Sequence, residues 1–571
     1  MDITKHNFAQ NIHKIDEQIS NCDFISIDCE FSGLFHNQRR NNELDNYEQI
    51  YVTTRQNINQ FQILQFGLSL FKKTTDEYNF DCHSYNFYIF PSKCIFLSED
   101  QRDRCFLSQS SSLTFLVENG FDFNKVIRDG ITYIPLNQLA TVETKIKAKL
   151  EENQMKTNFI EIEKDEDKKF FQEINDKLIK FMNNNDQQEE ILPQCNSYYR
   201  RIIYETVRKS SFNDSIQMST GKNENKGSII LKKGTPKPKD EQAKALMFEN
   251  VGFTLIIKSL IKHQKPLIGH GMFFDLLHIY NIFIEPLPEK YDEFKQSIKS
   301  CFNNVYDTAH ISMCPTLKKV FETVQSEPFL ETGFLLKNSP SEYSNDNFNR
   351  YHEAGYDSFI TGCCFVQMIR YLCVQDNLSL EDFFNNNKIL DKFRNQIFIY
   401  GNYDIKFLNL QGNDEPLNRN HIFHMNFTKT FTRHDLNLIF AEFGGLNRIV
   451  FLDEESAFCI LRDEGKTAEV IEALIVNPKG YKFGFKIQHY SEFMKQKTTN
   501  TAQKQQPLAT SMKPKHESTP MTSKDSLDEC VKKKIKLSNT PIKSPNVVKK
   551  KSSQMVDKLF DDNMSWTTAT H

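Results

Sequence analysis

The chain has 571 residues, a formal net charge of −3 at neutral pH, and 39 % hydrophobic residues. Its length predicts about two to four domains, and the near-neutral charge excludes a basic footprint spread over the whole chain, so nucleic-acid binding would need local patches. No stretch approaches the roughly 18 apolar residues that span a bilayer, and the polar start MDITKHNFAQ lacks a signal-peptide core, so we expect neither a membrane span nor secretion. The 13 cysteines include no C-x-x-C pair, which indicates reduced thiols.

Three short apolar segments in the first part of the chain predict strands: FISIDCEFSGL (24–34), FQILQFGLSLFK (61–72) and YNFYIFP (85–91). In the first of them, Asp28 and Glu30 are two residues apart, so both carboxylates project from one face of the strand. Burial of two like charges raises the pKa of at least one unless a cation lies between them, and Mg²⁺ prefers oxygen ligands. The alternative is a strand that runs out into solvent at Asp28.

The composition changes in the middle of the first half and then changes back. Residues 143–190 are rich in Lys, Glu, Asp and Asn at helical spacing, and CNSYYRRIIYETV (195–207) follows. Helix and strand patterns then alternate through 248–280, as in an α/β sheet covered by helices. We therefore interpret 166–238 as a small inserted module that splits one α/β domain into two halves, 1–165 and 239–418.

Two later acids lie on apolar helix faces. Asp275 has helical spacing with Met272, Leu276 and Ile279, and Asp357 lies on a similar stripe of the next long helix. A lone buried acid costs on the order of several kcal/mol unless it is paired or bound to metal. For Asp357 the alternative is an acid that is favoured at a helix N-terminus by the helix dipole.

His352 lies five residues before Asp357, where its imidazole could take a proton from water; the alternative is a surface or capping histidine. Asp307 is a further candidate acid, but it starts a helix and we favour an N-cap for it. One histidine and four acids on one α/β domain suit a two-metal phosphodiester hydrolase. These five candidates are His352, Asp28, Glu30, Asp275 and Asp357.

The order of these motifs resembles the DEDD exonucleases, in the subgroup that uses a histidine as general base. The motifs are D-x-E, then G-H-x-M-x-x-D in IGHGMFFD, then H-x-x-x-x-D in HEAGYD. With FSGL, LQFGL, NFYIFP and SSLTFLVENGFDFNKVIRDGI (111–131), the chain resembles the family of poly(A)-specific ribonucleases over roughly residues 1–495. The resemblance implies an RNase H-like α/β domain with a mixed central sheet flanked by helices, split by a small α+β single-strand-binding insert and followed by an RRM-like α+β sandwich.

The same resemblance implies a Mg²⁺-dependent 3′-to-5′ exoribonuclease that degrades poly(A) tails and releases 5′-AMP. Asp28, Glu30, Asp275 and Asp357 would bind two divalent ions, for which Mn²⁺ can substitute, and His352 would activate water. A homodimer that works in nucleus and cytoplasm on single-stranded RNA with a 3′ poly(A) tail is expected. A nuclease that trims oligoadenylated noncoding RNA and a catalytically silent RNA adaptor are the alternatives.

The resemblance also implies RNA contacts away from the metals. It places an adenine pocket at five residues, each of which taken singly also fits a core position: Phe31, Ser32, Leu34, Leu113 and Phe115. The insert resembles an R-x-x-x-H single-strand-binding module in which Tyr204 replaces the histidine, so the copy is degenerate. Arg200 and Arg201 could still contact phosphates, and the alternative is a helical hairpin that only braces the enzyme.

The last parts of the chain are an RRM-like domain at 419–495 and a disordered basic tail at 496–571. The domain is expected to run strand, helix, strand, helix, strand, with RIVFLDEESAFCIL (448–461) as its central strand. In the family a Trp at the place of Phe451 stacks on the 5′ cap; Phe is a poorer platform, and we favour a buried core Phe over a cap contact. Lysine clusters at 532–536 and 547–551 resemble a bipartite nuclear import signal, or form a solvated basic tail.

Overall fold

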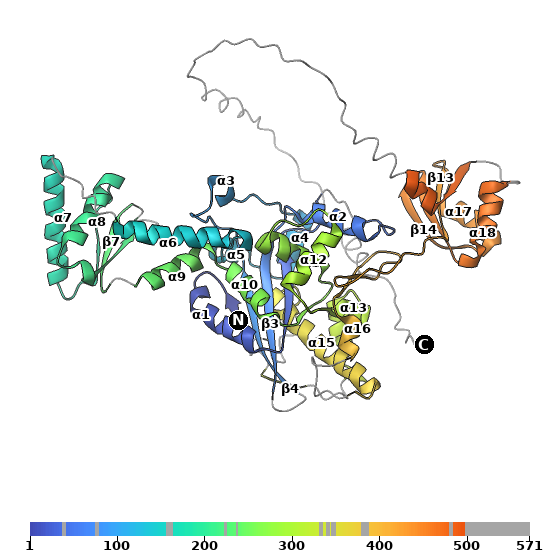
Figure 1. Cartoon of the computed structure of the whole chain (residues 1–571), viewed down its shortest axis with the longest axis horizontal. Helices are drawn as coiled ribbons and strands as arrows, with labels where there is room; N and C mark the ends of the chain where they lie inside the picture. Colours follow the sequence, from blue (N-terminus) through green and yellow to red (C-terminus); the bar gives the residue numbers. More distant parts are fainter. Residues whose placement is uncertain are drawn as a thin grey trace, which may run out of the picture. The chain divides into compact units, whose positions relative to one another are not determined.

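A computed structural model describes residues 1–36, 41–74, 79–155, 164–221, 225, 227–235, 238–329, 335–338, 343, 350–378, 388–478 and 484–496. The chain divides into two compact units, Met1–Glu415 and Pro416–His571 (Figure 1). The two predicted basic clusters lie outside the described residues. Within the described part of the chain, no helix has the length and apolar character needed to cross a membrane.

The first unit is built on a mixed sheet in the order β1-β4-β3-β2-β8-β9, with β10 paired to β4. β2 runs antiparallel to β3 and parallel to β8, which confirms the predicted mixed α/β sheet. The strands are β1 (Asp2–Ile3), β2 (Phe24–Phe31), β3 (Ile63–Lys73), β4 (Asn79–Tyr88), β8 (Leu267–Gly269), β9 (Val305–Asp307) and β10 (Leu335–Asn338), with a separate hairpin of β11 (Gln396–Phe398) and β12 (Phe407–Asn409).

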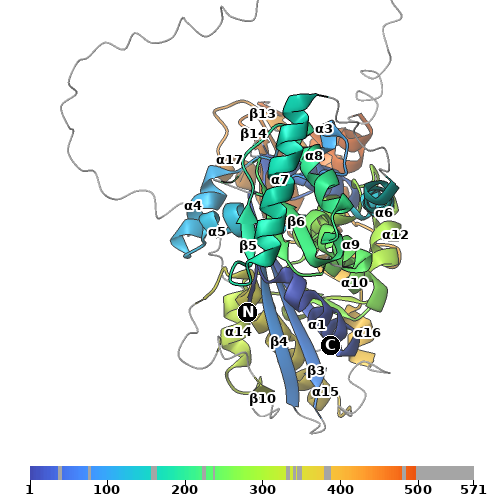
Figure 2. The same cartoon turned by 90° about the vertical axis from the view of Figure 1, so that its left-hand side faces the viewer.

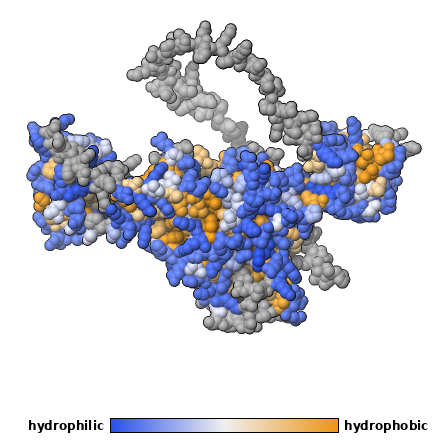
Figure 3. Space-filling view, viewed as in Figure 1, coloured by the Kyte–Doolittle hydropathy of each residue, from blue (hydrophilic) through white to orange (hydrophobic). Residues whose placement is uncertain are grey.

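Helices cover this sheet, and α15 lies along it against β2, β3 and β4 (Figures 1 and 2). The helices are α1 (Phe8–Asn21), α2 (Tyr47–Ile58), α3 (Glu99–Arg102), α4 (Ser110–Glu118), α5 (Phe123–Asp129), α10 (Thr254–His263), α11 (Phe273–Ile279), α12 (Tyr291–Cys301), α13 (Thr308–Ser312), α14 (Leu317–Val324), α15 (Ala354–Gln375) and α16 (Lys388–Phe393), with short turns η2 (Leu136–Gln138) and η5 (Tyr280–Ile284). The surface in the view of Figure 3 is mostly hydrophilic with smaller apolar patches.

The start of α15 is pressed against the middle of the sheet, and a glycine makes that approach possible. A Cβ atom built on Gly67 of β3 would lie 1.8 Å from the carbonyl oxygen of Ala354, the first residue of α15. Gly67 is paired with Asp28 across β2 and β3. The contact at Gly67 therefore places the first turn of α15 next to the residue pair that includes Asp28.

The insert has its own small core. A three-stranded antiparallel sheet in the order β5-β7-β6 packs with α7 and α8, and the flanking helices α6 and α9 pack on each other (Figure 2). The elements are α6 (Leu139–Met155), α7 (Asp165–Asn183), β5 (Glu189–Ile191), α8 (Ser197–Lys209), η3 (Asn213–Ser215), β6 (Ile216–Thr220), β7 (Ile229–Lys233) and α9 (Lys239–Asn250). The domain limits drawn from the sequence stay predictions.

The second unit is an antiparallel sheet in the order β14-β15-β13-β16 whose one face packs on α17 and the α18–η10 segment. Its elements are β13 (Ile422–Phe427), α17 (Arg433–Ile439), η8 (Ala441–Phe443), β14 (Leu446–Asp453), β15 (Ser456–Leu461), η9 (Glu464–Lys466), α18 (Thr467–Val470), η10 (Ile471–Val476) and β16 (Phe485–His489). The prediction of one central strand at 448–461 was wrong. This stretch is a hairpin of β14 and β15, because the Asp453 carboxylate accepts the backbone N–H of Glu455 at 2.8 Å and closes a turn.

Candidate active site

Four carboxylates from three separate segments meet at the end of β2. The strand supplies Asp28 and Glu30, α11 supplies Asp275, and the first turn of α15 supplies Asp357. Burial, followed by the charges of Asp357 and Asp275, raises the pKa of Asp28 and of Glu30 well above its usual range. Burial likewise raises the pKa of Asp275 and of Asp357 to about 7. The acids are thus close enough to repel one another, although they come from segments far apart in the chain.

His352 lies beside this cluster. The metal-ligating atoms of Glu30, His352 and Asp357 all lie within 4.8 Å of one another. The backbone at His352 has a φ of 69°, and its N–H donates to Asp357 Oδ2 at 2.9 Å. The Phe115 ring meets the imidazole edge-on, with 4.5 Å between centroids. Burial lowers the pKa of His352, so the imidazole is neutral and able to accept a proton at neutral pH.

The donor set fits a divalent cation. Asp275 Oδ1 and Asp357 Oδ1 are buried and have no hydrogen-bond partner among the described residues. Buried carboxylate oxygens without partners are costly unless a cation neutralises them, and oxygen ligands are the ones that Mg²⁺ and Mn²⁺ accept. The chemistry of this donor set therefore suits a divalent cation.

Asp307 is an N-cap, as the sequence favoured, and it also sets the place of α11. Its fully buried carboxylate accepts four backbone N–H groups, from Gly271 at 2.7 Å, Met272 at 3.2 Å, Ala309 at 3.0 Å and Phe398 at 3.1 Å. Burial raises its pKa to about 6, and these four bonds oppose that rise. Because Gly271 and Met272 lead directly into α11, Asp307 holds the helix that carries Asp275.

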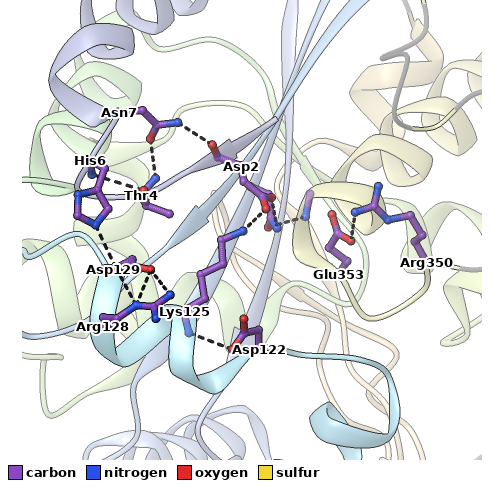
Figure 4. A network of polar contacts seen from close by, with 12 residues as sticks. Asp2, Thr4, His6, Asn7, Asp122, Lys125, Arg128, Asp129, Arg350 and Glu353 are labelled. Carbon is purple, nitrogen blue, oxygen red and sulfur yellow. Dashed lines mark hydrogen bonds and ion pairs between the residues drawn. The ribbon is translucent and has the colours of Figure 1, made fainter.

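A chain of polar contacts holds the segment that carries His352 from outside the carboxylate cluster (Figure 4). Lys125 of α5 pairs with Asp2 of β1 and lies 4.3 Å from the ring centroid of Tyr88. Asp2 Oδ1 accepts from Asn86 Nδ2 at 3.1 Å, and Asn86 Oδ1 accepts from the backbone N–H of Gly355 at 3.2 Å. The contacts thus run from α5 to the first turn of α15, two residues before Asp357.

This network gives the GFDFNKV block a structural role that the sequence alone did not supply. Asp122 caps α5 by accepting from the N–H of Lys125, and Phe121 and Phe123 pack around Tyr88. Close by, Arg350 pairs with Glu353 at 2.7 Å (Figure 4), on either side of His352 in the chain. No short-range spacing rule links these residues, because the contacts join β1, β4, α5 and α15.

The five residues of the predicted adenine pocket have different surroundings. Ser32 is fully buried, and its hydroxyl donates to the carbonyl of Leu107 at 2.8 Å while it accepts from the N–H of Gln62 at 2.9 Å. It braces the loop after β2 and presents no free group to RNA. The other four, which are partly buried or exposed, are Phe31, Leu34, Leu113 and Phe115.

His278 was missed by the sequence reading, although it lies three residues after Asp275 and hence on the same side of α11. It is fully buried, and its ring stacks on Phe31 with 4.4 Å between centroids. Burial lowers the pKa of His278 to about 3, so it is a neutral aromatic surface. It fixes one face of Phe31, the residue that follows Glu30.

The insert candidates lie on α8, apart from the metal ligands in sequence. Arg201 Nε is 3.2 Å from Glu205 Oε1, and Arg200 is only partly exposed. Tyr204, at the place of the motif histidine, packs against the core of the insert. Tyr204 is thus part of the insert core, while Arg201 lies on the exposed side of α8.

Phe451 is 40 % exposed, so the favoured prediction of a buried core Phe was wrong. Its ring meets Phe427 edge-on at 6.2 Å, and the Arg433 guanidinium lies 5.3 Å from its centroid. Phe451 pairs with the core residue Ala457 and so lies on the core side of the sheet, but β14 is an edge strand and the ring stays exposed at the rim of that core.

Comparison with known proteins agrees with this geometry. A model of the CAF1 family ribonuclease matches residues 3–365, and a model of an RNA binding domain matches 412–496. Poly(A)-specific ribonuclease PARN of Xenopus laevis is 29% identical over 540 residues, covering 88% of this chain and 83% of the relative; PARN of Homo sapiens is 29% identical over 534 residues, covering 87% and 81%. The pre-piRNA 3′-exonuclease trimmer of Bombyx mori is 26% identical over 452 residues, covering 75% and 82%. The chain belongs to the CAF1 family of ribonucleases and carries an RNA-binding domain in its second unit.

Proposed function

We propose that this protein is a divalent-metal-dependent 3′-to-5′ exoribonuclease that shortens poly(A) tails and releases 5′-AMP. The chemistry rests on one observation, the cluster of four carboxylates with raised pKa values beside a neutral histidine. The preference for poly(A) is supported by the relatives from Xenopus laevis and Homo sapiens, which are named poly(A)-specific ribonucleases.

Asp28, Glu30, Asp275 and Asp357 would hold two divalent ions, Mg²⁺ or Mn²⁺. When bound, such ions supply Lewis-acid activation of the attacking water and neutralise charge on the leaving 3′ oxygen. His352 takes a proton from the attacking water, and Phe115 holds the imidazole in place by its edge-on contact.

The substrate end is expected to lie between the cluster and Phe31. Stacking on a phenylalanine holds a single-stranded base without reading its edge, and His278 keeps that ring from turning.

The test compares release of AMP from A20, U20 and a structured RNA with a short A tail. We expect A20 to be the best substrate and the change Asp28→Ala to lower kcat/KM by at least about three orders of magnitude. The control is Asp103→Ala, which removes an exposed acid paired with Lys93. Full activity of Asp28→Ala would remove the proposed site, and equal rates on A20 and U20 would remove the deadenylase assignment.

A second candidate function is trimming of oligoadenylated noncoding RNA, and similarity to the Bombyx mori trimmer favours it. Faster turnover of the structured RNA with a short A tail than of A20 would support trimming. A silent RNA adaptor would bind A20 and release no AMP in the presence of Mg²⁺.

We also propose a homodimer, nuclear and cytoplasmic localisation, and only weak contact with the 5′ cap. Sedimentation tests the dimer, and removal of both lysine clusters should keep a fluorescent fusion out of the nucleus if they direct import.

At Phe451 the Arg433 cation already lies over the ring, so a positively charged methylated guanine would have to displace it or use the other face.

A further inference from the structure

The sheet of the second unit has a face that is not packed on its helices. The core cluster takes Phe423, Met425 and Phe427 from β13 and Ala457, Cys459 and Leu461 from β15. Because side chains alternate along a strand, His424 and Phe458 point to the opposite face. The two are direct cross-strand partners on the middle strands of the sheet, with 5.5 Å between ring centroids.

Aromatic side chains on the middle strands of such a sheet are where RNA-recognition domains stack single-stranded bases. In this chain His424 and Phe458 are only 3% and 5% exposed. Their burial has an identifiable cause, since the chain turns back after β16 as a helix over 490–496.

The helix over 490–496 places aromatic rings on this pair. Phe493 stacks on His424 with 3.9 Å between centroids and an interplanar angle of 16°, and it meets Phe458 edge-on at 5.4 Å. Tyr490 lies 5.4 Å from Phe458, and its hydroxyl accepts from Arg419 Nη1 at 2.6 Å. Burial lowers the pKa of His424, which therefore offers a neutral ring for stacking.

The contact is small enough to be replaced. Tyr490, Phe493 and Met494 follow the i, i+3, i+4 spacing of one helix face and are partly buried, while 491, 492, 495 and 496 are exposed. A helix of about two turns has little stability of its own, so its position depends on these ring contacts. A nucleobase stacked on His424 would make the same kind of contact as Phe493 does.

We propose that His424 and Phe458 form a second binding site for single-stranded RNA, covered by the helix over 490–496, and that RNA bases displace Phe493 to reach it. The site binds bases by stacking and is independent of the metal cluster. This adds a gated RNA surface to the proposed function but does not rest on hydrolysis of poly(A), because binding can be measured without metal.

The test uses the full chain in EDTA and a fluorescent A20 oligonucleotide. Phe493→Ala should tighten binding about tenfold, since stacking no longer has to displace a ring. Glu492→Ala, on the exposed side of the same helix, is the matched control and should leave the affinity unchanged. The double change Phe493→Ala with Phe458→Ala should bring the affinity back to the wild-type value.

Hydrogen exchange on the unchanged protein gives a readout that needs no variant to fold. Excess A20 should speed amide exchange over 490–496 and slow it over Ile422–Phe427 and Ser456–Leu461. Unchanged or weaker RNA binding by a folded Phe493→Ala variant would overturn the proposal. So would slower exchange of 490–496 on adding RNA, because the helix would then be part of the RNA-binding surface and not its cover.

Discussion

Mutual repulsion of buried acids is the main feature of this protein at the scale of single residues. Burial and neighbouring carboxylates raise the pKa of Asp28 above its ordinary value, so the ionised group destabilises the metal-free fold as pH rises above that ordinary value. We expect Asp28→Asn to raise the Tm of the metal-free protein by about 2–4 °C and to reduce the further rise that Mg²⁺ causes. Thermal unfolding in EDTA and in Mg²⁺ checks this, and a lower metal-free Tm would contradict it.

Asp307 differs from Asp28 because backbone N–H groups satisfy its carboxylate, although burial raises its pKa as well. The Asp307 carboxylate accepts four backbone N–H groups. In Asn one of its two oxygens is replaced by an NH₂ group, so some of these N–H donors would face another donor. We expect Asp307→Asn to lower the free energy of unfolding by about 3 kcal/mol and to lower kcat through α11. Urea unfolding measures the first effect; an unchanged midpoint would exclude this role.

At the scale of elements, the first turn of α15 depends on β1, β4 and α5. Asn86→Ala leaves the buried N–H of Gly355 without its acceptor, so we expect kcat to fall about tenfold while KM for A20 changes less. The exchange Asp2→Asn with Asn86→Asp keeps a donor–acceptor pair and should restore part of kcat. Arg128→Ala, which removes an exposed pair with Asp129, is the control. Equal loss in the single and exchanged variants would mean that the network does not position His352.

At the scale of the whole molecule, the two units have separate cores and should unfold separately. We expect two calorimetric transitions, and Mg²⁺ should raise the midpoint of only the one that belongs to Met1–Glu415, because the proposed metal ligands lie there. Leu436→Ala, in the core of the second unit, should lower the free energy of unfolding of that unit by about 2–5 kcal/mol. The effect of Mg²⁺ on the other transition should stay the same. A single calorimetric transition would contradict this, and so would a rise of both transition temperatures on adding Mg²⁺.

Sequence reasoning failed, or left two interpretations open, where a turn or a buried polar contact lacked a short-range signal. The hairpin of β14 and β15 has no glycine at its turn, and the Asp453 side chain closes it instead. Ser32 resembles a pocket residue in sequence, yet its hydroxyl is used between Leu107 and Gln62. Both depend on partners that become neighbours only after folding.

The sequence by itself determined the local elements of the site. Alternation on a strand puts Asp28 and Glu30 on one face, and helical spacing puts Asp275 and Asp357 on faces turned toward the core, because these periods follow from backbone geometry. Only the tertiary structure decided that β2, α11 and α15 meet, that Asp307 and Asn86 hold them, and that Phe493 covers His424. Those contacts depend on sheet order and close packing, which no spacing along the chain specifies.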